Sequence, residues 1–124
     1  MRKAVLGAFV LGLLLKFFIF DLMIAEGNSM YPSIRPGSIL VISRLVYGFR
    51  LPWMKNYIVR WNAPKEGEIV VFYTPSGGLA VKRCVEITGR YFMALGDNGP
   101  QSFDSRSYGA VPADHIIGRV LGVK

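Results

Sequence analysis

The first twenty residues are strongly apolar and show no helical polar stripe. An apolar run over residues 4–20 follows Arg2 and Lys3, and Lys16 alone interrupts it. Its seventeen positions lie at the short end of the range for a membrane-spanning helix. Lys16 falls near one end of the run, where its long side chain can reach the lipid headgroups. The pattern therefore predicts a membrane anchor over residues 1–24.

Two other interpretations of this segment stay open. A buried helix of a soluble protein is disfavoured because the run has no polar face. A cleavable secretory signal fits the basic start and the apolar core, but Ala25, Glu26 and Gly27 match the usual cleavage site only loosely. We expect an uncleaved, single-pass anchor with the N-terminus in the cytoplasm and the residues after about 25 outside.

Beyond residue 25 the pattern changes to short segments rich in β-branched residues, separated by Gly and Pro turns. Such segments are typical of strands in an all-β barrel or sandwich. The expected strands cover residues 39–46, 68–73, 79–88, 91–95 and 116–120. Residues 25–124 thus form one small β domain, and the protein is mainly β.

Alternation is clearest over residues 79–88. Leu79, Val81, Val85 and Ile87 fall on one face, and Ala80, Lys82, Cys84, Glu86 and Thr88 fall on the other. Gly89 and Arg90 follow and predict a two-residue type II′ hairpin. The aromatic and basic residues of the stretch 47–61 suit an interfacial loop.

The chain has a formal charge of +7 and is 52% hydrophobic, which excludes a disordered polyelectrolyte. Its basic residues are scattered and form no run, and no nucleic-acid-binding motif is present. The charge therefore favours an anionic membrane surface over nucleic acid as a partner.

Cys84 is the sole cysteine and His115 the sole histidine. An intrachain disulfide is impossible, and a metal site has no obvious ligands. We expect no metal and no cofactor, so that any catalysis would use commoner side chains.

A serine attacks a carbonyl group efficiently only when a base accepts its proton. Lysine can be that base if burial lowers its pKa from about 10.4 by roughly 3 to 5 units. Lys82 sits mid-strand between two small uncharged neighbours on its face. Ser29 sits between Gly27 and Pro32, directly after the predicted anchor. The residues alone leave two interpretations, a Ser–Lys dyad or a solvated lysine on a strand.

Four segments resemble the conserved segments of bacterial type I signal peptidases. Residues 27–34 are similar to the nucleophile segment Ser-Met-x-Pro-Thr-Leu, and residues 67–72 to Gly-Asp-Ile-Val-Val-Phe. Residues 81–89 are similar to the lysine segment, and residues 96–106 to the last segment. They occur in order over nearly the whole chain. The sequence is therefore identified as a minimal member of that family.

The resemblance implies a role for each matching residue. Ser29 would be the nucleophile, with its own amide stabilising the oxyanion, and Lys82 the general base. The supporting residues of the last segment would be Asp97, Asn98, Ser102, Asp104 and Arg106, with Ser102 orienting the lysine and Asp104 paired with Arg106. Met30 and Ile34 would line pockets for small substrate side chains.

The chain departs from the family pattern at several positions. Gly27 stands where some members have a serine that helps the oxyanion hole, and residues 99–101 replace the usual Arg-x-Asn. The large additional β-domain of some members is absent. His115 lies outside the matching segments, and we expect it to be structural.

The resemblance implies an endopeptidase that removes N-terminal signal peptides, with small residues at P1 and P3, from exported preproteins. It would reside in the plasma (inner) membrane with an extracytoplasmic catalytic domain. Two alternatives stay open: a dedicated processing peptidase, for example for pilin or conjugation components, and an inactive membrane-tethered domain that binds peptides.

Overall fold

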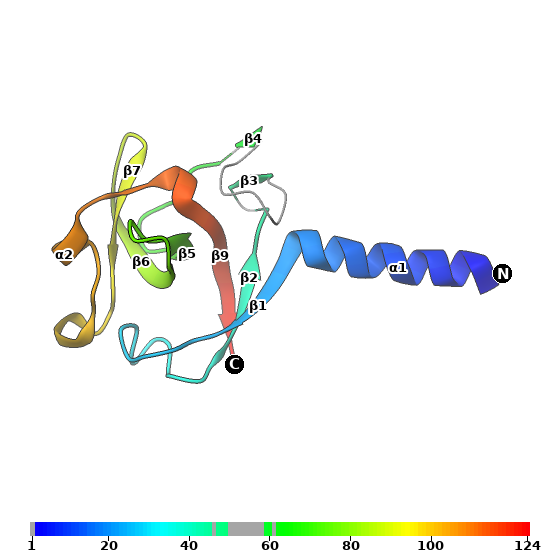
Figure 1. The fold of residues 1–124 in the computed structure, drawn as a ribbon, viewed down its shortest axis with the longest axis horizontal. Coiled ribbons are helices and arrows are strands. Elements are labelled where there is room, and N and C mark those ends of the chain that lie inside the picture. The colour runs from blue at the N-terminus through cyan, green and yellow to red at the C-terminus, as the bar shows by residue number, and fades with distance from the viewer. Residues whose placement is uncertain (1, 46, 50–58, 61) are drawn as a thin grey trace.

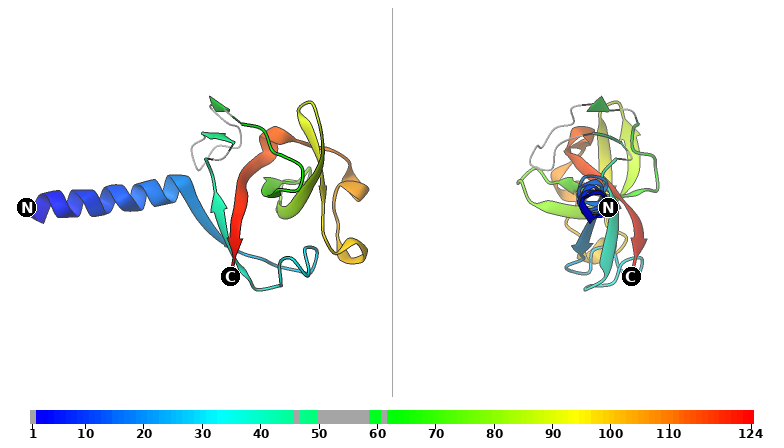
Figure 2. Two further views of the ribbon diagram at one scale, coloured as in Figure 1. Left: turned by 180° about the vertical axis from the view of Figure 1, so that it is seen from behind. Right: turned by 90° about the vertical axis from the view of Figure 1, so that its right-hand side faces the viewer.

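The computed structural model describes residues 2–45, 47–49, 59–60 and 62–124. In these residues a curved antiparallel sheet of seven strands forms the body of the protein (Figures 1 and 2). In spatial order the strands are β1 (Phe20–Ile24), β2 (Ile39–Ser43), β9 (Ile116–Val123), β5 (Ile69–Tyr73), β6 (Leu79–Thr88), β7 (Tyr91–Leu95) and β8 (Val111–Pro112).

Shorter elements complete the described fold. They are the strand pair β3 (Gly48–Phe49) and β4 (Val59–Arg60), the helix α2 (Ser105–Tyr108), and the 3₁₀ turns η1 (Gly99–Gln101) and η2 (Ala113–His115). The mainly β prediction is confirmed. The expected strand 39–46 ends at Ser43, and most of the stretch 47–61, predicted as an interfacial loop, lies outside the described residues.

The predicted hairpin after residue 88 is also confirmed. Thr88 pairs with Tyr91 across a two-residue turn. Gly89 has φ of +60°, whereas no described residue other than glycine has a positive φ. A positive φ at the first turn position alone is the signature of type II′.

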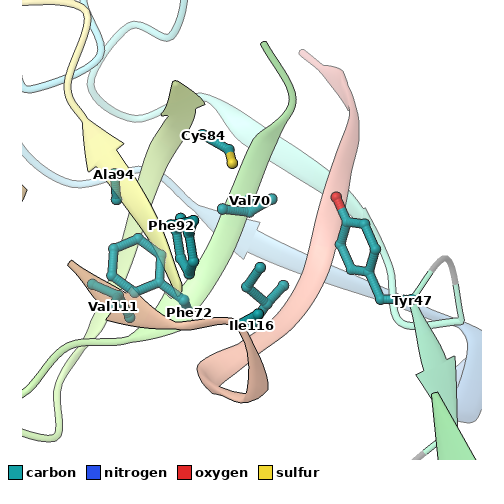
Figure 3. Packing of buried hydrophobic residues seen from close by; sticks show 9 residues of the cluster. Tyr47, Val70, Phe72, Cys84, Phe92, Ala94, Val111 and Ile116 are labelled. Carbon is teal, nitrogen blue, oxygen red and sulfur yellow. The ribbon is translucent and has the colours of Figure 1, made fainter. Parts of the chain in front are cut away.

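The sheet is buried on both faces at its centre, which explains the unbroken apolar run of β5. Val70 and Phe72 point to one side and Val71 to the other. The first core contains Tyr47, Val70, Phe72, Cys84, Phe92, Ala94, Val111, Ala113 and Ile116 (Figure 3). The second core contains Met30, Ile34, Leu40, Ile42, Val71 and Ile117.

A β-bulge changes the predicted faces of β6. Ala80 and Cys84 contact the first core and Val81 the second, as alternation requires. The pairing with β7 then shifts between Cys84 and Glu86, and Ile87 packs against the first core. The prediction that Ile87 shares a face with Val81 is wrong, because the extra residue of a bulge reverses alternation beyond it.

The N-terminal helix α1 (Arg2–Ile19) projects away from the sheet and continues into β1 (Figure 1). The sheet thus begins within the segment that the sequence assigned to the anchor. In the described part of the chain, no helix is both long and apolar enough to cross a bilayer. The prediction of a transmembrane helix over residues 1–24 is therefore unsupported; the 18 residues of α1 include Arg2, Lys3 and Lys16.

Phe72 is completely buried, and its ring meets that of Phe92 edge-to-face with centroids 5.4 Å apart. We expect Phe72→Ala to lower the free energy of unfolding by about 3–5 kcal/mol, because it removes apolar contacts and leaves a cavity. Urea denaturation followed by circular dichroism measures the change.

Phe103→Ala is the matched control, since Phe103 is 72% exposed and its ring meets that of Tyr108 edge-to-face. It should cost less than about 1 kcal/mol. Equal losses for the two variants would contradict the assignment of the first core.

Candidate active site

Ser29 lies in the loop of residues 25–38 between β1 and β2, here called the Ser29 loop. Hydrogen bonds close its base, from Ala25 N to Ser38 O at 2.9 Å and from Gly37 N to Ala25 O at 2.8 Å. Met30 and Ile34 are buried in the second core and hold the middle of the loop against the sheet. The loop is therefore a packed part of the domain.

Lys82 lies on β6, opposite Val70 of β5, and its side chain is only 7% exposed. Its Nζ donates a hydrogen bond of 2.7 Å to Ser29 Oγ, which joins residues 53 positions apart. Burial lowers the pKa of Lys82, while the nearby charge of Asp104 acts in the opposite direction. The structure thus brings together the two residues of the predicted dyad, with the lysine in the environment that favours a neutral amine.

Gly96 allows the segment after β7 to approach the Ser29 loop. A Cβ atom at this position would lie 2.5 Å from Ser29 O and 2.1 Å from Ser102 Oγ, far closer than real Cβ contacts. Two residues on, Asn98 N donates to Ser29 O at 2.8 Å, and the Asn98 side chain donates to Asn28 O at 3.1 Å. This segment therefore fixes the backbone on which Ser29 stands.

Asp104 is fully buried beneath this segment. It accepts hydrogen bonds from Ser102 Oγ at 2.6 Å and Gly96 N at 2.9 Å, and Arg106 Nε and Nη2 donate at 3.0 and 2.5 Å. Burial alone would raise the pKa of the Asp104 carboxyl, but these bonds hold it well below its usual range. The predicted Asp104–Arg106 pair is present, and Ser102 is bonded to Asp104. A contact from Ser102 to the lysine stays a prediction.

A second carboxylate links the Ser29 loop to β6. Asp97 accepts from Arg83 Nε and Nη2 at 2.9 and 2.7 Å and from Ser33 Oγ at 2.5 Å. The bonds from Arg83 and Ser33 hold the pKa of Asp97 below its ordinary value, against a smaller opposing effect of burial. Arg83 also donates to Gly67 O at 2.8 Å.

The sequence interpretation did not single out Arg83 or Ser33 as site residues. The available signal for Arg83 was its position as the charged exception on an otherwise apolar strand face. The sequence interpretation also assigned no role to residues 99–101, where the chain departs from the family pattern. In the structure, Gln101 Oε1 accepts a hydrogen bond of 3.1 Å from Asn28 Nδ2, beside Ser29.

A cavity of about 330 Å³ opens beside the Ser29–Lys82 contact. It is lined by Met23, Ile24, Ala25, Glu26, Gly27, Ser29, Met30, Ile34, Leu79, Ala80, Val81 and Lys82. Met30 and Ile34 thus line a pocket at the candidate site. Most of the lining residues have apolar side chains, whereas polar atoms make up slightly more than half of the exposed cavity surface. The cavity can therefore hold small apolar groups, and the hydroxyl and the amine are its chemically reactive groups.

His115 does not line this cavity; its Nδ1 lies 3.0 Å from Tyr73 O. That contact joins η2 to the end of β5. Among the described residues, no three His, Cys, Asp or Glu side chains gather where they could hold a metal ion.

Comparison with known proteins shows which family this sequence matches. The family model described as signal peptidase, peptidase S26, matches residues 1–90 and 81–123. The chain is 35% identical to signal peptidase I of Buchnera aphidicola subsp. Baizongia pistaciae, in an alignment that covers 61% of this chain and 25% of that protein.

Two further relatives align over more of their length. Signal peptidase I of Bacillus caldolyticus is 25% identical, covering 86% of this chain and 80% of that protein. The probable signal peptidase I-1 of Synechocystis is 24% identical, covering 92% and 76%. By contrast, the chain spans only about a quarter of the length of two Buchnera relatives. Since the family model extends over nearly the whole chain, the protein belongs to the signal peptidase family, peptidase S26.

Proposed function

We propose that this protein is a type I signal peptidase, an endopeptidase that removes N-terminal signal peptides from exported preproteins. Ser29 is the nucleophile and Lys82 the general base. The observation that carries the proposal is the 2.7 Å hydrogen bond between Ser29 Oγ and the buried Lys82 Nζ, both of which line a cavity. Membership in a family of serine peptidases supports the same reaction.

The reaction begins with the neutral amine of Lys82. As Ser29 Oγ attacks the scissile carbonyl carbon, its proton passes to Lys82 Nζ, and the carbonyl oxygen becomes an oxyanion. The backbone N–H of Ser29 donates to that oxyanion. The protonated lysine then gives its proton to the leaving amine, which leaves an acyl ester on Ser29.

Water completes the cycle. Lys82 accepts a proton from the water as its oxygen attacks the ester carbon, and Ser29 regains a proton when the ester bond breaks. The supporting groups act by positioning the reactive ones. Asn98 N bonds to the Ser29 backbone oxygen, Gly96 leaves room for that approach, and Ser102 and Arg106 hold the Asp104 carboxylate. No step uses a metal or a cofactor.

The cavity beside Ser29, with the apolar side chains of Met30 and Ile34 in its wall, supports a preference for small side chains at P1 and P3. Attachment to the plasma (inner) membrane through α1, with the β-domain on the outer side, is part of the proposal. The exposed apolar side chains of that helix, such as Leu6 and Phe9, support attachment to lipid, and Arg2 and Lys3 support a cytoplasmic N-terminus.

Ser29→Ala and Lys82→Met should each reduce cleavage of a secretory preprotein by at least about 10³-fold, because each removes one partner of the proton transfer. The full chain in detergent is incubated with the preprotein, and mass spectrometry maps the cut. A cut after a small-x-small sequence that survives a chelator is expected for the wild type.

Lys82→Met also separates lost chemistry from lost structure. It replaces a buried amine by an apolar chain of similar length, so its melting temperature should equal or exceed that of the wild type. Cleavage that persists in either variant would refute the dyad. A folded wild type that cuts none of several preproteins would favour a dedicated substrate or an inactive peptide binder.

The pH dependence follows from the buried amine. Lys82 is a base only when neutral, and burial lowers its pKa, so kcat/KM should rise with pH through a midpoint below the ordinary lysine value near 10.4. The unfolded chain keeps the extra proton in that pH interval, so the free energy of unfolding should also rise with pH there.

Peptide cleavage and urea denaturation over pH 6–11 measure the two effects. In Lys82→Met, the free energy of unfolding should rise less steeply with pH in this interval, because the variant has no amine to titrate at that position. A cleavage midpoint at or above the ordinary lysine value would contradict a desolvated base.

Gly96→Ala should reduce kcat by about 10²-fold, because its methyl group displaces Ser29 or Ser102 from its place. Gly122→Ala is the matched control on β9, where an added Cβ meets nothing within 4 Å. Kinetics of both purified variants, with circular dichroism to confirm folding, test the close approach. Equal activity in the two variants would argue against it.

A further inference from the structure

Glu26 is the one acidic residue in the wall of the cavity beside Ser29. It lies three positions before Ser29 in the Ser29 loop, and it is exposed to solvent. Of the cavity-lining residues, only Glu26 and Lys82 carry ionisable side chains. These two residues therefore supply the charges of the cavity wall itself.

The Glu26 carboxylate differs from the other carboxylates of the site. Asp97 is paired with Arg83 and Asp104 with Arg106. Within the part of the chain that the structure describes, Glu26 has neither a hydrogen bond nor an ion pair through its side chain. Its charge is available to a ligand in the cavity.

Lys82 does not cancel this charge when the site is ready to react. Its amine is buried, is bonded to Ser29 Oγ, and is neutral when it serves as a base. The cavity then carries a net charge of −1, in a chain whose formal charge is +7. The site is thus electrostatically opposite to the protein as a whole.

We propose that Glu26 makes the cavity selective for peptides with a basic side chain next to the bond held at Ser29, and against peptides with an acidic one. The inference rests on the proposed function, because it takes the occupant to be an extended peptide. Side chains of an extended peptide alternate in direction. Those that point inward meet the apolar wall around Met30 and Ile34, and a neighbour that points outward meets the rim where Glu26 lies.

The effect is of moderate size because Glu26 is exposed to water. Attraction to Lys and repulsion of Glu together correspond to about a 2- to 20-fold preference for the Lys peptide at low ionic strength. Salt should reduce this preference, since exposed charges are screened within about 10 Å at 0.1 M. Apolar side chains at the same position should bind with intermediate affinity.

A binding experiment with the full chain in detergent tests the proposal without requiring turnover. The protein carries Ser29→Ala, and the probes are fluorescent peptides with a small-x-small sequence at P3 to P1 and either Lys or Glu at one of the positions P4, P2, P1′ and P2′. Fluorescence anisotropy gives the Kd of each Lys and Glu pair at 20 mM and 300 mM NaCl. Glu26→Gln and Glu26→Lys are added to the Ser29→Ala background.

Tighter binding of the Lys peptide is expected at one or more positions, reduced to within about twofold by Glu26→Gln and inverted by Glu26→Lys. Glu86→Lys is the matched control, because Glu86 is exposed on β6 and does not line the cavity. It makes the same change in net charge and should leave the preference unchanged. A preference that follows net charge in both variants would overturn the role of Glu26.

The wild type is assayed for cleavage of the same peptides in parallel. A charge preference in binding without cleavage would sustain the role of Glu26 and refute the peptidase activity. Cleavage without any charge preference at any position would sustain the peptidase activity and refute the role of Glu26. Peptides that neither bind nor react would overturn both.

Discussion

Lys82 Nζ lies 2.7 Å from Ser29 Oγ, where the lysine is almost entirely shielded from water. Removing an ammonium group from water costs several kcal/mol, so the site favours the neutral amine. The same burial that weakens the domain is what makes a lysine useful as a base. The site shields this amine from water and places the Ser29 hydroxyl beside it.

Both partners depend on segments that are distant in sequence. Lys82 is buried on β6, where it pairs with Val70 in the apolar run of β5. The second core holds the Ser29 loop through Met30 and Ile34. The segment after β7 then closes the site from a third direction. Gly96 permits its contact with Ser29 O, and Asn98 N bonds to the same oxygen.

The carboxylates are divided between structure and recognition. Asp104 is buried and held ionised by Arg106, Ser102 and backbone amides, which favours a fixed scaffold. Asp97 joins Arg83 to Ser33 and so ties β6 to the Ser29 loop. Glu26 is exposed and lines the cavity, where a carboxylate can act on what enters. Their different surroundings, rather than their residue type, separate these roles.

The mainly β domain, the hairpin at Gly89 and the residues of the candidate dyad could be predicted from the sequence, because alternation, turn residues and matching segments are local features. Folding was needed to show that Ser29 and Lys82 meet, that Arg83 pairs with Asp97, and that the sheet starts at Phe20. It also decided the bulge after Cys84, which reverses the face of Ile87. These features depend on contacts between segments that are far apart in the chain or, for the bulge, on one extra residue in a strand pair, and alternation alone specifies neither.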